Sequence, residues 1–278
     1  MKAKSDCIVC LLKQTLNTAR IATQDPRIHR KALDRVAKII PGLSLDQTPA
    51  ALSQPVYSIV AGLTGLPDPF KKQKDDTNRI ALALLPEART MVARAKDKLD
   101  AAVHAAAAGN IIDLGIGHKF DIEKDFREIM TQAFAINALE DFRKELRAGR
   151  KLLYLGDNAG EIVFDTILVE QILATGTEVV FAVKSGPIIN DATMADAEVS
   201  GMKKLTRIIE TGSNDIGIHW DHVSDEFRAA FKNADVILAK GHGNFETCND
   251  RPGNIYMLLK AKCDMVANEL GSSLETSC

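Results

Sequence analysis

The chain has 278 residues, a formal net charge of -2 and an aromatic content of 5%, so it can bury a sizeable core as one large domain or two modest ones. The near-neutral charge and the few aromatic residues argue against a nucleic-acid partner or an anionic membrane surface. No apolar run approaches the length of a membrane span, and residues 1–14 lack a signal-peptide pattern, so we expect a cytoplasmic protein with no membrane partner.

Apolar residues recur at helical spacing through most of the first 150 residues, and capping residues or prolines mark the helix ends. The predicted helices cover residues 5–24, 27–40, 48 onward, two segments within 70–108 that break near Pro86, then 121–134 and 138–148. Residues 109–115 begin and end with glycine and are predicted as a turn. Residues 1–150 are therefore expected to form an all-helical N-terminal region.

Cys7 and Cys10 form a C-x-x-C pattern at the start of the first predicted helix. Zinc would need two further ligands at the usual spacing, and no strand–helix–strand unit precedes the pattern as in a thioredoxin-like redox site. The apolar neighbours favour two buried structural cysteines over a metal site, and a metal site over redox chemistry. The five cysteines are odd in number and scattered, unlike a disulfide framework.

Strand and helix patterns alternate from residue 151 onward, which predicts an α/β domain over 151–278 with a parallel sheet covered by helices on both faces. The predicted strands are 152–155, 177–183, 206–210 and 235–239, the helices are 160–174, 192–199 and 224–232, and residues 255–270 hold a last helix and strand.

Three of the predicted strands end in loops that carry carboxylates, amides or lysines. These residues are Asp157 and Asn158, then Lys184 with Asn190 and Asp191, then Lys240 with Asn244 and Glu246. Taken alone, Asp157 or Asn158 could simply cap the following helix, and Glu161 could complement its dipole. A doubly wound sheet brings such loops together at one edge, so the three loops together favour a binding site.

The residue types indicate what such a site would bind. Carboxylate and amide oxygens suit Mg²⁺ or Mn²⁺, which is normally shared with a substrate phosphate. A lysine in a glycine-rich loop suits phosphate oxygens. Neither an NTPase P-loop nor a dinucleotide-binding glycine pattern is present in the sequence. His242 has no serine elbow nearby and is interpreted as a loop histidine, with substrate contact as the lesser alternative.

The motifs CIVCLLKQ, GLPDPF, AGNIID, YLGDNAGEIVFD, VKSGPIINDATMADA, AKGHGNFET and LLKAKCDMVANELG occur in this order along the chain. With them the sequence resembles the DUF89 family, the damage-control phosphatases that share the ARMT1-like domain, in its short prokaryotic stand-alone branch. The resemblance implies a helical N-terminal region joined to a Rossmann-like α/β domain. It also implies metal-dependent hydrolysis of phosphate esters of damaged or surplus metabolites.

The resemblance also implies roles for individual residues. The family's metal ligands carry over onto Asp157, Asn158 and Asp191, and its phosphate-binding loop onto Lys240, Gly241, Gly243 and Asn244. Asn110 and Asp113, which alone would be interpreted as an Asx turn, match a helical motif that would face the same cavity. Asn190 and Lys184 are expected beside the substrate, and Glu161 is expected to orient a metal-bound water.

The predicted function is hydrolysis of phosphate monoesters by attack of a metal-bound water, with Mg²⁺ or Mn²⁺ and with Co²⁺ or Ni²⁺ as further candidates. A covalent aspartyl-phosphate at Asp157 stays open as a variant of this mechanism. The alternatives are a carboxyl methyltransferase that uses S-adenosylmethionine and a non-catalytic metabolite-binding module. The expected partner is a small phosphorylated metabolite, and the sequence leaves its identity, the oligomeric state and the role of the C-x-x-C pattern open.

Overall fold

The computed structural model describes residues 1–115, 128, 130 and 132–271, with 110–115 as backbone alone. Its centre is a sheet of five parallel strands in the order β3-β2-β1-β4-β5. The strands are β1 (Lys151–Leu155), β2 (Glu178–Val183), β3 (Arg207–Glu210), β4 (Val236–Lys240) and β5 (Ile255–Leu258). The chain reverses its direction of travel across the sheet between β1 and β4, where doubly wound folds bind their ligands. The predicted α/β fold is therefore confirmed.

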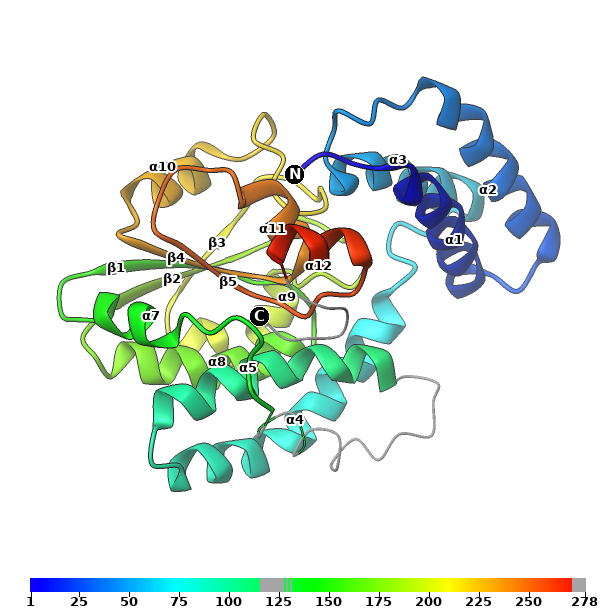
Figure 1. Cartoon of the computed structure of the whole chain (residues 1–278). Coiled ribbons are helices and arrows are strands. Elements are labelled where there is room, and N and C mark those ends of the chain that lie inside the picture. The colour runs from blue at the N-terminus through cyan, green and yellow to red at the C-terminus, as the bar shows by residue number, and fades with distance from the viewer. Residues whose placement is uncertain (116–127, 129, 131, 272–278) are drawn as a thin grey trace.

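Side chains of the strands alternate between two hydrophobic cores, as the pleat requires. Leu152 and Tyr154 of β1 face one core, and Leu153 and Leu155 face the other. Helices cover both faces (Figure 1). The first core is covered by α4 (Lys71–Arg94), α5 (Lys98–Gly115) and α8 (Glu161–Leu173), and the second by α10 (Asp225–Asn233) and α11 (Gly241–Cys248).

The first three helices lie together to one side of the sheet (Figure 1). They are α1 (Ser5–Ala22), α2 (Pro26–Ile39) and α3 (Pro49–Thr64). Asp25 and Thr48 cap the second and third of them, each followed by a proline in the first turn. The remaining elements are η1 (Ile40–Gly42), α7 (Leu139–Glu145), α9 (Met194–Val199), η2 (Met202–Lys204) and α12 (Asp264–Leu270).

The helix predicted over 121–134 lies mostly outside the described residues, and 132–134 are not helical. Two further predictions before the sheet are wrong. Helix α4 runs through Pro86 without a break. The carbonyl of Leu82 loses its partner there, but Leu82 is exposed and water can solvate it. Helix α5 continues through residues 109–115, so the predicted turn is wrong. Gly109 instead allows close packing, because a Cβ there would lie 3.0 Å from the Cα of Glu161.

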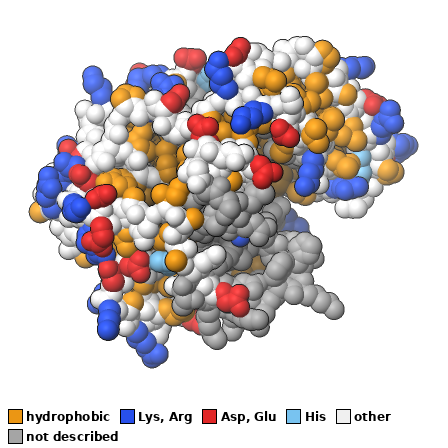
Figure 2. Space-filling view, in the orientation of Figure 1, with side chains coloured by type: hydrophobic (Ala, Val, Ile, Leu, Met, Phe, Trp, Pro, Cys, Tyr) orange, Lys and Arg blue, Asp and Glu red, His pale blue; other side chains and the backbone are white. Residues whose placement is uncertain are grey.

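Acidic and basic side chains are interspersed over the face shown in Figure 2. Among the described helices, none is both long and apolar enough to cross a membrane.

Candidate functional site

The loops after β1 and β2 are joined directly, which brings the predicted metal ligands together. The N–H of Ala192 donates to the carbonyl of Asp157 at 2.8 Å, and Asn158 and Asp191 pair as an isolated antiparallel bridge. Asn190 lies beside them, and all four polar residues line one cavity. Two loops about thirty residues apart in the chain thus form one wall at the carboxyl edge of the sheet.

The wall concentrates negative charge. The Asn158 Nδ2 donates to Asp157 Oδ2 at 2.9 Å and to Glu161 Oε2 at 3.1 Å, so it holds two carboxylates close together. Burial, then the charges of Glu161 and Asp191, raise the pKa of Asp157 well above its ordinary value. Burial also raises the pKa of Asp191 to about 6, although Lys184 opposes this. A divalent cation would relieve this repulsion, so the donor set fits the metal that the sequence implied.

Strand β4 passes into α11 without a loop, so residues 241–246, predicted as a glycine-rich loop, are helical. Gly241 has φ +79°, and a Cβ there would overlap the Asp157 carboxylate. Only glycine therefore lets the start of α11 lie against Asp157. Gly243 and Asn244 line the cavity, and the Asn244 amide donates to the carbonyl of Gly156 at 3.1 Å.

Lys240 points away from the cavity. Its ammonium, on a side chain 1% exposed, lies 2.5 Å from Glu161 Oε1 and 2.7 Å from Asp165 Oδ1, and donates to the carbonyl of Ala106 at 2.6 Å. The strand period explains this placement, because Lys240 continues the face of β4 that packs on α8. These bonds hold the Lys240 ammonium inside the protein, so they do not support the predicted contact of Lys240 with a phosphate.

Lys184 is also engaged inside the protein. Its ammonium donates to the carbonyl of Gly217 and lies 3.8 Å from Asp191 Oδ2, on a side chain that is buried. It therefore offsets part of the charge of the wall rather than offering a free cation. The predicted substrate residues Asn110 and Asp113 have side chains outside the described residues.

The cavity has a volume of about 770 Å³ and lies between the sheet edge and the N-terminal helices. Lys262, in the segment between β5 and α12, is exposed and also lines the cavity. Its charge opposes the effect that burial has on the pKa of Asp157. Lys262 is not among the predicted site residues, because the sequence leaves the boundaries of the helix and strand within 255–270 open. Its position just after the last strand was the signal that could have found it.

His242 lies in the first turn of α11 rather than in a loop, and it also lines the cavity. Burial lowers its pKa to about 4, which leaves a neutral imidazole near pH 7. Its Nε2 lies 2.8 Å from the carbonyl of Lys260 and accepts from the N–H of Lys262 at 3.0 Å. His242 therefore holds the segment that carries the Lys262 ammonium.

The C-x-x-C pair is split by the fold. Cys7 is buried with its Sγ 3.7 Å from the Met265 sulfur, as predicted, but Cys10 is exposed. The prediction of two buried cysteines is therefore wrong for Cys10. Cys7 and Cys10 are three residues apart and so share one face of α1, and both line the cavity.

The chain is similar to known proteins over nearly its whole length. Residues 3–277 match the family described as the damage-control phosphatase ARMT1-like domain. The chain is 36% identical to "Damage-control phosphatase PH1575" of Pyrococcus horikoshii over 97% of this chain and 94% of that protein. It is 35% identical to "Damage-control phosphatase" of Archaeoglobus fulgidus over 98% and 96%. The crystal structure of the P. horikoshii DUF89 protein superposes with a TM-score of 0.91, at 34% identity over 100% of this chain and 98% of that one.

Proposed function

The chain belongs to the damage-control phosphatase family that shares the ARMT1-like domain, and we propose that it hydrolyses phosphate monoesters of small metabolites with the help of a divalent cation. The names of its relatives support a phosphatase role. The observation that carries the metal dependence is the meeting of Asp157, Asn158 and Asp191 at the switch point of the sheet, in one wall of the cavity.

Asp157, Asn158 and Asp191 would hold the cation. Their two carboxylates and one amide offer oxygen ligands of the kind that Mg²⁺ and Mn²⁺ prefer. When bound, the cation would supply Lewis-acid polarisation of the phosphate and a water of lowered pKa. The residues themselves supply a crowded set of negative charges that favours cation binding before substrate enters.

The phosphate would lie between this wall and Lys262. Lys240 and Lys184 are bound to carboxylates and carbonyls inside the protein, whereas the Lys262 ammonium is exposed in the cavity. The N–H groups of Gly243 and Asn244, in the first turn of α11, would add partial positive charge. In this arrangement Lys240 acts through Glu161, which it fixes in place beside Asn158.

The proposed partner is a small phosphorylated metabolite. A cavity of about 770 Å³ falls within the range that encloses small ligands. The N-terminal helices close one side of it with Gln14, Ser53 and Tyr57, so they would select the part of the substrate beyond its phosphate.

The proposal is tested by a phosphatase screen on the purified chain. Phosphate release is measured from p-nitrophenyl phosphate and from a panel of sugar phosphates, with Mg²⁺, Mn²⁺, Co²⁺ or Ni²⁺ and with a chelator. We expect release that depends on the added cation and stops with the chelator. Equal release with chelator would refute the metal dependence, and no release from any ester with any cation would refute the phosphatase activity.

A further inference from the structure

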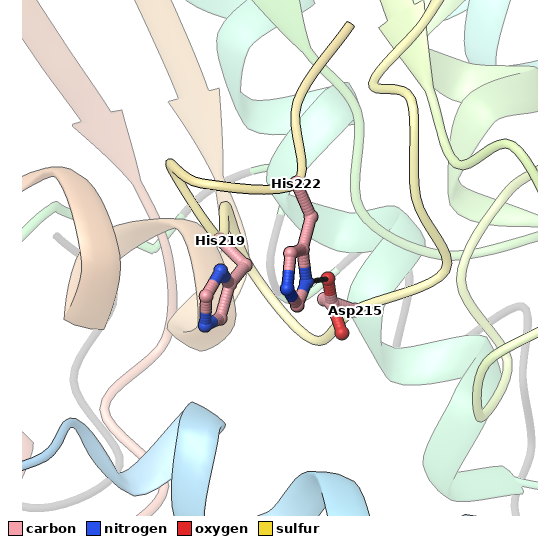
Figure 3. Close-up of side chains that lie close together, drawn as sticks. All are labelled: Asp215, His219 and His222. Atoms are coloured by element: carbon pink, nitrogen blue, oxygen red, sulfur yellow. Dashed lines mark hydrogen bonds and ion pairs between the residues drawn. The ribbon is translucent and has the colours of Figure 1, made fainter.

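The segment between β3 and α10 brings together three side chains that can bind a metal. One ligand atom from each of Asp215, His219 and His222 lies within 4.8 Å of those of the other two. The His222 Nδ1 lies 2.7 Å from Asp215 Oδ2, and the two imidazole rings stack with centroids 3.9 Å apart. Figure 3 shows His222 between His219 and the carboxylate. None of the three is among the described residues that line the cavity.

Hydrogen bonds fix the segment that carries these side chains. The N–H of His222 donates to the carbonyl of His219 at 2.9 Å, which closes a turn. The residues flanking His219 are both bound to α11. The N–H of Ile218 donates to Thr247 Oγ1 at 2.9 Å, and the Trp220 indole donates to the Thr247 carbonyl at 3.1 Å. The cluster is therefore built on a segment that is anchored to a helix of the sheet domain.

One ring nitrogen of the cluster lacks a partner. The Nδ1 of His219 is buried and makes no hydrogen bond within the described part of the chain. Burial of a polar atom without a partner is costly, so such an atom in a native fold calls for an explanation. An imidazole nitrogen with a free lone pair is a metal ligand. The His222 side chain is 55% exposed, which leaves a path for an ion and room for water.

We propose that Asp215, His219 and His222 bind a divalent transition metal ion, with Zn²⁺ the best match. Two imidazole nitrogens and one carboxylate oxygen, completed by water, form a set that Zn²⁺ accepts in tetrahedral geometry and that Mg²⁺ does not favour. Bonds of about 2.0–2.1 Å place the ligand atoms of such a shell roughly 3.3 Å apart. The two rings stack with their planes 13° apart, so at least one imidazole must turn for both lone pairs to reach one ion, which would replace the proton between His222 and Asp215.

The site would brace one wall of the cavity. Gly217, between Asp215 and His219 in sequence, lines the cavity and accepts the hydrogen bond of the Lys184 ammonium. An ion bound by the flanking residues would fix this segment, and with it the position of Lys184 beside Asp191. The role is structural and separate from the cation proposed at Asp157.

The test uses full-length protein carrying D157N and D191N, so that the cavity cation site is removed. Co²⁺ is titrated into the metal-free protein, and its visible absorption reports nitrogen and oxygen ligands. We expect one Co²⁺ per chain. We expect H219N together with H222N, in the same background, to weaken Co²⁺ binding by more than ~100-fold. Removing the ligands themselves should cost more affinity than removing residues that only support ligands. His29, on α2, gives the matched control H29N, which should leave Co²⁺ binding unchanged.

Two results would overturn the proposal. One is Co²⁺ affinity that does not change when His219 and His222 are replaced. The other is a sulfur-to-cobalt charge-transfer band, which would locate the ion at exposed thiols such as Cys10 or Cys263. If the double histidine variant folds poorly, D215N serves in its place and should also weaken binding. Zn²⁺ should raise the midpoint of thermal unfolding only in chains that keep the cluster.

Discussion

The ammonium of Lys240 lies 2.5 Å from Oε1 of Glu161, beneath the turn that carries the proposed metal ligands. Asp165 shares the same ammonium at 2.7 Å and also accepts a hydrogen bond from the Tyr154 hydroxyl. Burial disfavours the charge of Lys240, but Asp165 and Glu161 outweigh it and raise the pKa of the ammonium. One buried cation is therefore shared by two buried carboxylates, and Glu161 also accepts a hydrogen bond from Asn158 at the proposed metal site.

Replacing Lys240 by Met should leave Glu161 and Asp165 buried without a counter-charge. We expect the free energy of unfolding in urea to fall by about 3–5 kcal/mol, the usual cost of breaking a buried ion pair. Adding D165N to K240M should recover part of this loss, because only one carboxylate then stays unbalanced. K203A, at an exposed lysine, should change stability by less than about 0.5 kcal/mol. A K240M chain as stable as K203A would contradict the proposed cluster.

Gly241 should matter for activity more than for stability. G241A puts a methyl group where the Asp157 carboxylate lies, at a backbone φ of +79°. G201A is the matched control, because Gly201 has φ +83° and no atom within 4 Å of the added carbon. Both should lose about 1–2 kcal/mol of stability through the left-handed backbone. Only G241A should also lose phosphatase kcat/KM, by roughly 100-fold if Asp157 moves by about 1 Å. Equal kcat/KM values in the two variants would argue against a role for Asp157.

Lys262 should contribute to substrate binding through charge. A charge-assisted contact worth about 1.5–3 kcal/mol predicts that K262A lowers kcat/KM for a phosphate monoester by roughly tenfold to a hundredfold. The dependence of KM on salt should weaken as well, because salt screens an exposed ammonium. Steady-state kinetics at two ionic strengths checks both effects, with K203A as the exposed control. If K262A keeps the salt dependence and kcat/KM of the parent, another cation holds the phosphate.

Glu246 gives the protein a stability that depends on pH. Burial raises its pKa from 4.5 to about 7, so the folded chain holds its proton more tightly than the unfolded chain. This contribution is fully present below pH 4.5 and is lost as the pH rises through 7. It amounts to about 3 kcal/mol at most. E246Q should therefore gain stability over the parent at pH 8 but much less at pH 5.

Urea unfolding at both pH values measures this difference. E198Q, on an exposed position of α9, controls for the loss of a glutamate charge in general. A gain in E246Q that is the same at pH 5 and pH 8 would show that burial of Glu246 does not control the pH dependence.

The alternation of strands and helices was enough to predict the sheet and the edge where its loops meet. Short apolar runs such as 152–155 and 236–239 mark buried strands, and their ends carry the polar residues. The approach of Asn158 to Asp191 follows from that topology, since their strands are neighbours in a parallel sheet. This part of the candidate site could be predicted because it depends on strand order alone.

Other features depend on a single residue of register or on packing partners far away in the chain. Lys240 was expected in a loop, but one further residue of strand turns its side chain to the α8 face. The turn predicted at 109–115 is helical because Gly109 fits against Glu161, a contact no local pattern reveals. The separation of His219 and His222 gives no strong motif, and only the tertiary fold brings them to Asp215.

The proposed metal site is tested by comparing the divalent-dependent phosphatase activity of D157N with that of D34N. Asp34 is an exposed aspartate on α2, paired with Arg30, far along the chain from the proposed site. Phosphate release from p-nitrophenyl phosphate is measured at increasing Mn²⁺ for both chains. We expect D34N to keep the activity of the parent and D157N to lose it at every Mn²⁺ concentration. Undiminished, Mn²⁺-dependent turnover by D157N would show that Asp157 does not hold the cation.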